Sequence, residues 1–435
     1  MNRSRPPKIV VIGAASSSFS GLLADLISSD ALAGAELALV DIDTEGLEIM
    51  AALGKRMARE WKRTTTVTAP ANRDEALRGA DFIITTISVG GVATWRQDED
   101  IPAKHGYYGH SVDTVGPGGL FRGLRLIPPL LDVCHDIERL CPDAWLINYS
   151  NPMPGICRAL RKATRVNVVG LCTAGYLPGQ VAKFLEIDQS RVEVISAGVN
   201  HWVWALKILV DGKDYTCQYK EKMKTLHRKG WYLPAVELME IFDVWPMPGA
   251  NHVAEFFPYF YGPDTDGRDS LEKYPMREGH DFDERAKTVV TQRETLRRQG
   301  AGLEPLGHKV EESADEAIRM LTSMWNGGRT RHYANVQNDG LVSNLPDHVV
   351  VEVPVIADSA GIRGVAVGPL PDSVVGLVQA RCAYYELLAD AAIQRSKHLA
   401  LQCLMNDNLT TSIPRAKACL QEMFEVQAKW LPGYK

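Results

Sequence analysis

Long hydrophobic runs are missing from this 435-residue chain, and their absence excludes a protein that spans a membrane with helices. A membrane span needs about 20 consecutive apolar residues, and no run approaches that length. The basic segment from Met1 to Lys8 leads directly into a short apolar run that ends at Gly13. A secretory signal would have a longer apolar stretch and a small-residue cleavage site. We therefore expect a cytoplasmic protein.

A surplus of charge of one sign is also missing. The 48 Lys and Arg residues are balanced by 53 Asp and Glu residues, so the formal net charge is −5. This balance gives no electrostatic reason to expect nucleic acid or an anionic membrane as a partner. The eight cysteines include no CxxC pair, so we expect free thiols, many of them in the core.

The first 200 residues show an alternation of strand and helix. Short apolar runs, typical of buried strands, alternate with amphipathic segments of helical spacing. This order predicts an α/β fold with a doubly wound, Rossmann-like sheet. The predicted strands are residues 8–13, 36–40, 66–68, 81–88, 145–149 and 166–170, and the helices between the first four are residues 20–29, 44–61 and 73–78.

The alternation fades after about residue 200. Residues 202–274 are rich in Trp, Tyr, Pro and His, residues 278–312 form a charged stretch of helical character, and residues 374–404 have apolar residues at helical spacing. A length of 435 residues suggests two domains. We predict a Rossmann-like domain over residues 1–198 and an α+β domain over residues 199–435.

The turn after the first strand has features of a dinucleotide-binding site. Small residues at Gly13 and Ala15 let a pyrophosphate approach the backbone, although Ala15 replaces the second glycine of the G-x-G-x-x-G fingerprint. Asp41 and Asp43 end the second strand, where a carboxylate binds ribose hydroxyls and repels a 2′-phosphate, which favours NAD over NADP. The alternative is a domain without a cofactor, in which Gly13 only makes a tight turn. The predicted cofactor-binding residues are Gly13, Ala15, Ser16, Ser17, Asp41, Asp43 and Ser88.

Polar residues also follow the later strands. Asn148 and Asn151 lie at the end of one predicted strand, where α/β sheets bind ligands. Cys172 follows the next strand, and His201 follows a further apolar run. Because thiolate and imidazole are transition-metal ligands, Cys172 and His201 are candidates for a metal site that keeps positions open for substrate. The alternative is that both residues are structural.

These segments together resemble glycoside hydrolase family four, the NAD- and manganese-dependent glycosidases. The matching segments run in family order over most of the chain, and their combination is specific although no single one is decisive. They are residues 12–16 (IGAAS), 41–43 (DID), 115–119 (VGPGG), 148–153 (NYSNPM), 170–172 (GLC), 199–201 (VNH), 251–258 (NHVAEFFP), 342–346 (VSNLP) and 351–354 (VEVP).

The resemblance implies a fold like that of lactate and malate dehydrogenases, assembled as a homodimer or homotetramer. The C-terminal domain would then contribute to the substrate and metal site and to oligomerisation. By the same resemblance, Cys172 and His201 bind Mn²⁺ or another divalent metal. Asn151 contacts the sugar, and the other implied substrate contacts are Arg96, Asp113 and Asn148.

The resemblance also implies a hydrolysis without net redox change, on a hexose or hexuronate glycoside of the α type. NAD oxidises C3 of the sugar, and a base removes the acidified C2 proton while the metal stabilises the enediolate. The glycosidic oxygen then leaves, water adds, and NADH returns the hydride. The implied partner is a small-molecule glycoside.

Two departures from the family pattern leave the general acid and the base open. Thr173 follows the metal-binding cysteine, where members commonly have His, Asp or Asn, and a Thr hydroxyl is a poor general acid. The general acid is then another group, such as Asp113 or a metal-bound water, or no general acid is needed. Residues 251–260 carry phenylalanines where a tyrosine base often sits. The predicted titratable candidates are His252 and Glu255, followed by Tyr259 and Tyr261.

The segment 251–258 is closer to the galactosidase, glucuronidase and galacturonidase branches than to the 6-phosphoglucosidase branch. Two other functions stay open. One is a net NAD-dependent dehydrogenase of a sugar or hydroxy acid, which would accumulate NADH. The other is a non-catalytic sugar or nucleotide sensor, suggested by Thr173 and the missing tyrosine base, although a sensor has no need of Cys172 and His201.

Overall fold

The structure is a computed structural model of the chain. It describes residues 5–108, 113–172, 177–227, 233–247, 250–260, 280–307 and 315–435. Within these residues, no helix is both long and apolar enough to cross a membrane. All eight cysteines lie in the described part of the chain and are free thiols, as expected.

The N-terminal half, from β1 to β6, is a parallel sheet with the strand order β3-β2-β1-β4-β5-β6. This order is that of the doubly wound dinucleotide-binding fold and confirms the predicted α/β class. Except for the edge strand β3, the strands consist mainly of apolar residues because both faces of a parallel sheet are covered, and every residue of β4 is buried. The strands are β1 (Lys8–Ile12), β2 (Glu36–Val40), β3 (Thr66–Thr68), β4 (Phe82–Thr85), β5 (Trp145–Asn148) and β6 (Asn167–Gly170).

Helices connect these strands and begin where the sequence supplies caps. The side chain of Asp43 accepts a hydrogen bond from the N–H of Gly46 and so caps α2. Pro117 lies in the first turn of α5, where a proline loses no helical hydrogen bond. The helices are the short 3-10 helix η1 (Ser17–Phe19), α1 (Ser20–Ser28), α2 (Thr44–Glu60), α3 (Arg73–Leu77), α4 (Gly91–Lys104), α5 (Gly116–Leu140) and α6 (Met153–Ala163).

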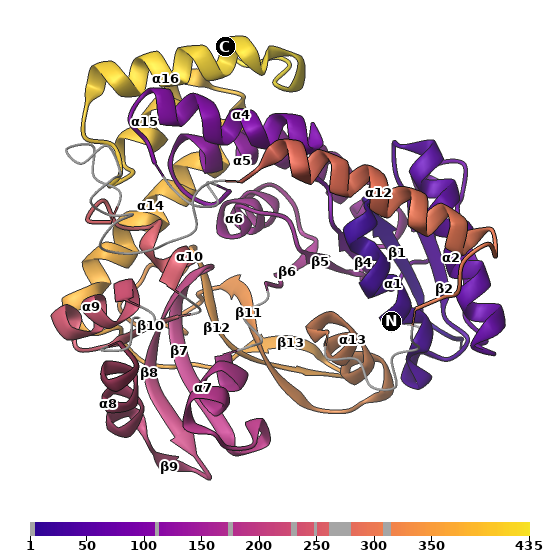
Figure 1. Ribbon diagram of the computed structural model, residues 1–435, viewed down its shortest axis with the longest axis horizontal. Helices are drawn as coiled ribbons and strands as arrows, with labels where there is room; N and C mark the ends of the chain where they lie inside the picture. The colour runs from indigo at the N-terminus through magenta and orange to yellow at the C-terminus, as the bar shows by residue number, and fades with distance from the viewer. Residues whose placement is uncertain are drawn as a thin grey trace.

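Antiparallel strands of the C-terminal half extend the same sheet beyond β6, so that the described residues form one 13-stranded sheet (Figure 1). Asn335 of β11 pairs with Gly170 of β6 and, on its other side, with Glu352 of β12. Glu352 in turn pairs with Gly198 of β7. This row brings the end of β6 toward the β7–β8 turn. The strands are β7 (Val192–Val199), β8 (Trp202–Val210), β9 (Lys213–Asp214), β10 (Trp245–Met247), β11 (Thr330–Gln337), β12 (Val350–Asp358) and β13 (Gly361–Gly364).

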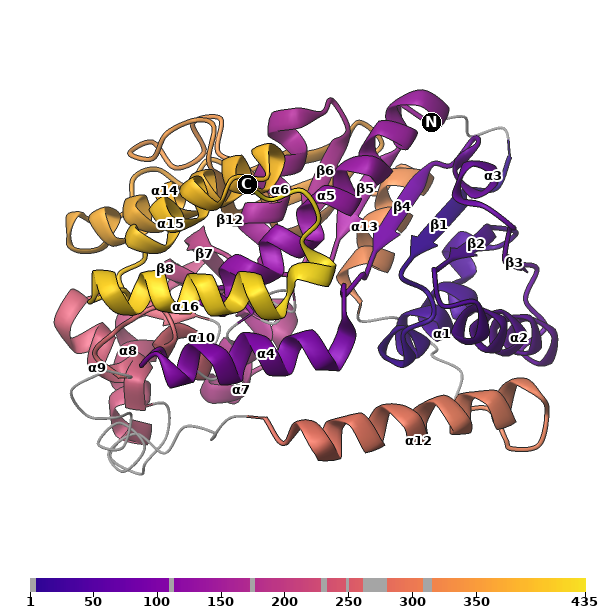
Figure 2. The same ribbon diagram turned by 90° about the horizontal axis from the view of Figure 1, so that it is seen from above.

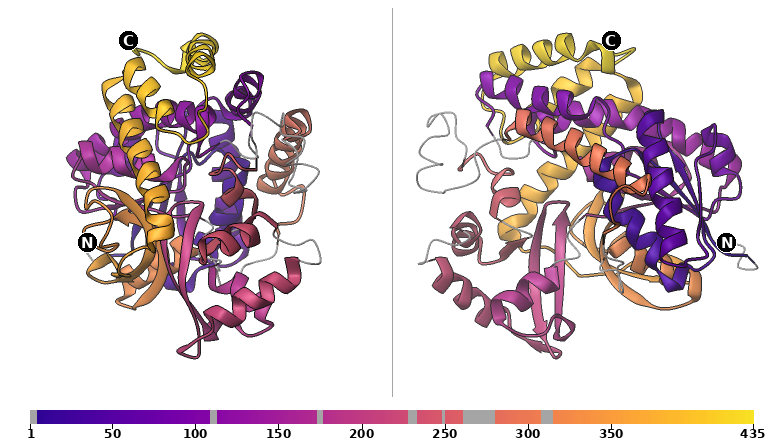
Figure 3. Two further views of the ribbon diagram at one scale, coloured as in Figure 1. Left: turned by 90° about the vertical axis from the view of Figure 1, so that its left-hand side faces the viewer. Right: turned by 45° about the vertical axis from the view of Figure 1, so that its right-hand side comes forward.

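The helices of the C-terminal half pack against both halves. Helices α14, α15 and α16 lie beside α4, α5 and α6 (Figure 3), and α12 lies along α2 and α4 (Figure 2). The predicted domain boundary after residue 198 falls at the end of β7 and stays a prediction. The helices are α7 (Leu177–Leu185), α8 (Thr216–His227), α9 (Leu233–Phe242), α10 (Ala250–Ala254), α12 (Phe282–Gly300), α13 (Glu316–Asn326), α14 (Asp372–Gln394), α15 (Lys397–Met405) and α16 (Ile413–Val426).

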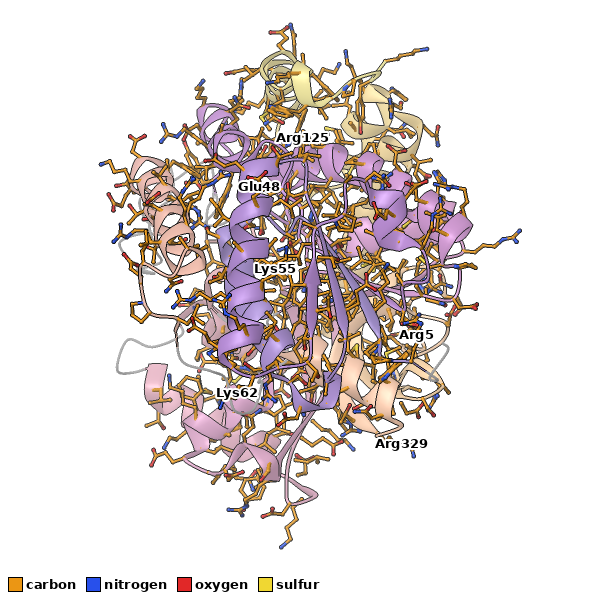
Figure 4. All side chains as sticks on the ribbon, turned by 90° about the vertical axis from the view of Figure 1, so that its right-hand side faces the viewer. Arg5, Glu48, Lys55, Lys62, Arg125 and Arg329 are labelled. Carbon is orange, nitrogen blue, oxygen red and sulfur yellow. The ribbon has the colours of Figure 1, made fainter. Side chains whose placement is uncertain are left out.

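The hydrophobic core does not follow the division into halves. One large core contains Ile9 of β1 and Leu388 of α14, while a second, smaller core lies between β8 and helices α7 to α9. Lys55 stands on the exposed face of α2 (Figure 4), whereas Arg125 is buried and pairs with Asp98 at 2.6 Å. The two halves therefore share an extensive buried interface.

Candidate active site

The turn after β1 is fixed by Gly13. Its φ of +95° belongs to the left-handed region, and a Cβ at this position would lie 2.8 Å from the carbonyl carbon of Thr86. The backbone N–H groups of Gly13 and Ala14 donate to the carbonyl of Val40, at 3.0 and 3.2 Å. The turn lies where the strand order of the sheet reverses, between β1 and β4, which is where doubly wound sheets bind ligands.

The two acidic residues after β2 have different contacts. Asp41 accepts hydrogen bonds from the backbone N–H groups of Ala15 (2.8 Å) and Asp43 (3.0 Å), and so braces the turn after β1. Asp43 caps α2 and forms an ion pair with Arg293 of α12 at 2.9 Å. The hydrogen bond from Arg293 lowers the pKa of Asp43 despite an opposing effect of burial. Their predicted roles as ribose ligands stay predictions.

The predicted serines flank the same turn. The hydroxyls of Ser16 and Ser18 lie 2.7 Å apart, and the hydroxyl of Ser17 donates to Oε1 of Gln292 of α12 at 3.1 Å. Ser88 precedes α4, and its carbonyl accepts a hydrogen bond from the N–H of Gly91 at 3.1 Å. Their contacts with a cofactor also stay predictions.

Cys172 and His201 form the second part of the site. Cys172 follows β6, and His201 lies in the turn between β7 and β8 with a φ of +66°. Burial raises the pKa of the Cys172 thiol, but the charge and hydrogen bond of His201 outweigh it and the net pKa is lowered. Burial opposes a charge on His201 as well, yet Cys172 raises its pKa to about 10. A thiolate beside an imidazolium is a donor pair that a divalent metal binds in place of the proton.

The loop before α5 orients the imidazole of His201. Oγ1 of Thr114 donates to Oδ1 of Asp113 at 2.8 Å and lies 3.2 Å from Nδ1 of His201. Because the Thr114 proton is used on Asp113, the Thr114 oxygen accepts a hydrogen bond from Nδ1–H. Nε2 is then the nitrogen left for a metal. In the part of the chain that the structure describes, no group of three or more His, Cys, Asp and Glu side chains is arranged to hold a metal.

Asp113 and Asn151 supply acceptors beside this pair. Nδ2 of Asn151 donates to Oδ2 of Asp113 at 3.1 Å, while Oδ1 of Asn151 is buried without a hydrogen-bond partner among the described residues. Burial raises the pKa of Asp113, but the positive charges of His201 and Arg122 outweigh it, so the net pKa is lowered. An ionised carboxylate and an open amide oxygen suit a ligand that carries several hydroxyl groups.

Two further titratable groups come from α10 and the residue after it. The ring of His252 lies 4.3 Å from that of His201, measured between centroids. Glu255 is buried, and its negative charge contributes to the raised pKa of His201. The structure therefore places His252 and Glu255 near the Cys172–His201 pair, and their catalytic roles stay predictions.

A buried carboxyl group that the sequence analysis missed lies behind Cys172. Glu352 of β12 accepts hydrogen bonds at Oε2 from Nδ2 of Asn200 (2.8 Å) and from Nδ2 of Asn335 (2.9 Å). Burial raises the pKa of Glu352 more than these amides lower it. Asn200 also forms a hydrogen bond with Cys172 and so connects Glu352 to the thiol. The available signal was a lone acid in the apolar run 349–357 (VVVEVPVIA).

The segment after α15 supports both loops of the site. Asp407 is buried, pairs with Arg381 at 2.9 Å and accepts a hydrogen bond from the backbone N–H of Gly116 at 2.8 Å. The next residue, Asn408, donates to the carbonyl of Phe256 at 2.8 Å. These bonds tie the loop before α5 and the segment after α10 to the C-terminal helices.

The remaining predicted residues make other contacts or are not described. The side chain of Arg96 is 41% exposed and pairs with α12. Asn148 is fully buried and hydrogen-bonded to β4, and Tyr259 is 63% exposed. Thr173 and Tyr261 lie outside the described residues. The substrate contacts predicted for Arg96 and Asn148 stay predictions.

Comparison with known families adds to this geometry. Residues 8–187 match the family model described as "Family 4 glycosyl hydrolase", and residues 196–410 match "Family 4 glycosyl hydrolase C-terminal domain". The chain is 31% identical to an alpha-galactosidase of Bacillus subtilis (strain 168), over 98% of this chain and 100% of the relative. It is 33% identical to a probable 6-phospho-beta-glucosidase of the same strain, over 98% of each chain.

Solved structures share the fold. The crystal structure of the putative glucosidase lplD from Bacillus subtilis aligns with a TM-score of 0.87 at 24% identity, covering 96% of this chain and 100% of the other. A 6-phospho-alpha-glucosidase from gut microorganisms, in complex with NAD and Mn²⁺, aligns with a TM-score of 0.84 at 24% identity, covering 98% and 99%. A lactate dehydrogenase from Eimeria maxima, with NADH and oxamate, aligns with a TM-score of 0.53 at 16% identity, covering 91% and 98%. The expected likeness to dehydrogenase folds is confirmed.

Proposed function

Because this chain belongs to family 4 of the glycosyl hydrolases, we propose that it cleaves a hexose or hexuronate glycoside by the NAD- and metal-dependent elimination route. The observation that carries this proposal is the Cys172–His201 donor pair, with Asp113 and Asn151 beside it. Ordinary glycosidases need a pair of catalytic carboxyl groups and no metal donors.

The residues present fit both implied groups. The left-handed turn at Gly13 leaves no room for a side chain and suits a pyrophosphate. Cys172 and Nε2 of His201 suit a divalent metal, and the structural neighbour solved with NAD and Mn²⁺ supports the same pair of groups. When bound, NAD supplies a hydride acceptor and donor, and the metal supplies a Lewis acid for sugar oxygens.

The chain's own groups bind the sugar and move protons. The carboxylate of Asp113, fixed by Thr114 and Asn151, accepts a hydrogen bond from a sugar hydroxyl. Its lowered pKa suits an acceptor better than a general acid. His252 and Glu255 are the groups proposed to take the C2 proton, since both lie near the donor pair.

The relatives are named for different sugars. The chain is 31% identical to an alpha-galactosidase, 33% to a probable 6-phospho-beta-glucosidase and 28% to an alpha-galacturonidase of Thermoanaerobacterium saccharolyticum. We propose an α-linked galactose-type sugar or its uronate, as the segment 251–258 suggests. Assembly as a homodimer or homotetramer and a cytoplasmic location complete the proposal.

The test is hydrolysis of nitrophenyl α- and β-glycosides of glucose, galactose, glucuronate, galacturonate and glucose 6-phosphate in D₂O, with NAD and Mn²⁺ omitted in turn. We expect release that needs both additions, with deuterium at C2 of the product sugar. Release by cofactor-free protein without NAD would exclude the route. NADH accumulating on a free sugar would instead indicate a net dehydrogenase.

A further inference from the structure

Helix α12 belongs to the C-terminal half by sequence and lies against the dinucleotide turn of the N-terminal half. Figures 1 and 2 show it along the outer side of the molecule near α2, and it also contacts η1. Its first turn is held at α4, where Arg285 stacks over Trp95 at 4.2 Å from the ring centroid. The remainder of the helix reaches the segments that carry the predicted cofactor-binding residues.

Gln292 and Arg293 of α12 contact predicted cofactor-binding residues directly. Gln292 accepts a hydrogen bond from the Ser17 hydroxyl at 3.1 Å, and Arg293 pairs with Asp43 at 2.9 Å. A Cβ built on Gly46 would lie 2.8 Å from Cβ of Ala15 and 3.0 Å from Nη2 of Arg293. The turn after β1, the first turn of α2 and the Arg293 guanidinium therefore meet at one point.

The guanidinium of Arg293 has a hydrogen-bond donor that no described residue accepts. Nη2 is used on Asp43, whereas Nε is buried and has no hydrogen-bond partner within the described residues. A buried donor without an acceptor is costly, so such an atom calls for a partner such as water, an ion or a ligand. The planar guanidinium also offers a face on which an adenine ring can stack.

We propose that Arg293 is a cofactor-binding residue that completes the adenosine end of the dinucleotide site from the C-terminal half. Its Nη2 holds the Asp43 carboxylate in place, and its Nε–H donates to an oxygen or ring nitrogen of the adenosine. This inference rests on the proposed function, because it assumes that the chain binds NAD. It adds a cationic residue from a distant part of the sequence to a site otherwise built from β1 and β2.

The test is calorimetric titration of NAD into the full-length chain after bound nucleotide has been removed. We expect Arg293→Gln to raise the Kd of NAD about tenfold, because a charge-assisted hydrogen bond and the fixed position of Asp43 are both lost. Arg298→Gln is the matched control: it removes the same charge from the same helix, where Arg298 pairs with Glu304, and should leave the Kd unchanged.

If the ion pair of Arg293 with Asp43 only stabilises the fold, a different result is expected. Arg293→Lys keeps a positive charge for Asp43 but lacks the Nε donor, so we expect its thermal midpoint without NAD to match that of the wild type while its Kd for NAD rises. An Arg293→Gln variant with wild-type affinity, or an Arg293→Lys variant with wild-type affinity, would overturn the inference alone. Failure of the wild-type chain to bind NAD would overturn the proposed function together with it.

Discussion

The orientation of His201 depends on a single hydroxyl group. Thr114 donates its proton to Asp113 and accepts the Nδ1 proton of His201, so it links the acceptor of the proposed sugar contact to the metal donor. Metal-binding histidines are commonly fixed in this way through their second ring nitrogen. In the proposed function, the loop before α5 therefore positions a metal donor as well as a substrate contact.

Replacing Thr114 by Val tests this link. The change keeps the shape of the side chain and removes the hydroxyl, so His201 loses its Nδ1 acceptor and Asp113 loses a donor. We expect Mn²⁺ affinity or turnover to fall about 10–100-fold, measured by Mn²⁺ titration and by nitrophenol release. Thr114→Ser retains the hydroxyl and should restore most of the loss; a Val variant equal to wild type would contradict the arrangement.

Cys172 is predicted to be the thiolate donor of the metal. Cys172→Ser should raise the Kd for Mn²⁺ by tenfold or more, since a serine hydroxyl is far harder to deprotonate than this thiol, whose pKa is lowered by His201. The measurement is Mn²⁺ titration followed by calorimetry. Cys217→Ser, at an exposed cysteine on α8, serves as the control and should not change the Kd. Equal Kd values for both variants would exclude Cys172 as a ligand.

At the scale of secondary-structure elements, the contact between α14 and α6 contains a cluster of charged side chains. Glu386 of α14 accepts hydrogen bonds from Arg158 and, at 2.6 Å, from Lys162. Burial raises the pKa of Glu386, but these two cations outweigh it and lower the pKa to about 2. The unfolded chain, with a Glu pKa near 4.3, binds this proton at a higher pH than the folded chain. The stabilisation is therefore complete above about pH 4.3 and is lost as the pH falls toward 2.

Glu386→Gln should accordingly lower the free energy of unfolding by about 1–2 kcal/mol at pH 7, a value reduced from the full linkage energy because the pair is partly exposed. The difference from wild type should shrink as the pH falls from 4 to 3 in urea titrations. Glu221→Gln removes an exposed pair with Lys224 and should leave the stability nearly unchanged at every pH. A constant difference between Glu386→Gln and wild type across this range would contradict the assignment.

The pair of Arg381 and Asp407 joins the C-terminal helices to the site. Asp407→Ala would leave the buried Arg381 without its carboxylate partner and release the N–H of Gly116. We expect a loss of about 3–5 kcal/mol in the free energy of unfolding, measured by urea denaturation. Asp211→Asn, which removes the charge of an exposed pair with Arg191 and is tolerated at the φ of +49° there, should cost less than about 1 kcal/mol. Similar losses of free energy for the two variants would show that the buried pair stabilises the fold no more than an exposed pair does.

Prediction from sequence succeeded where local pattern decides the structure. Most of the parallel strands were found because they are short apolar runs bounded by turn residues, and Gly13 was found because a strand–turn–helix order surrounds it. The pattern treated Asp41 and Asp43 alike, since it cannot tell a carboxylate that braces a turn from one that caps a helix. Glu352 and Arg293 were missed because their partners lie far away in sequence: Asn200 is 152 residues from Glu352, and Asp43 is 250 residues from Arg293.

On the scale of the whole molecule, the sheet and the core cross the predicted domain boundary. β11 and β12 lie between β6 and β7, and the large hydrophobic core includes residues of both halves. The row from Gly170 to Gly198 passes through Asn335 and Glu352, so the pair of Asn335 with Gly170 would be lost if either half unfolded. We expect the regions on either side of residue 198 to unfold together.

We therefore expect a single cooperative unfolding transition for the chain, in which calorimetry and near-UV circular dichroism give the same midpoint. NAD and Mn²⁺ bind only the folded state in this view, so each should shift the whole transition upward by mass action. The proposed contact of Arg293 with NAD leads to the same expectation of an upward shift of the whole transition, because NAD then contacts both halves. Two resolved transitions, of which NAD shifts only one, would show that the halves unfold independently and that the strands joining them contribute little to stability.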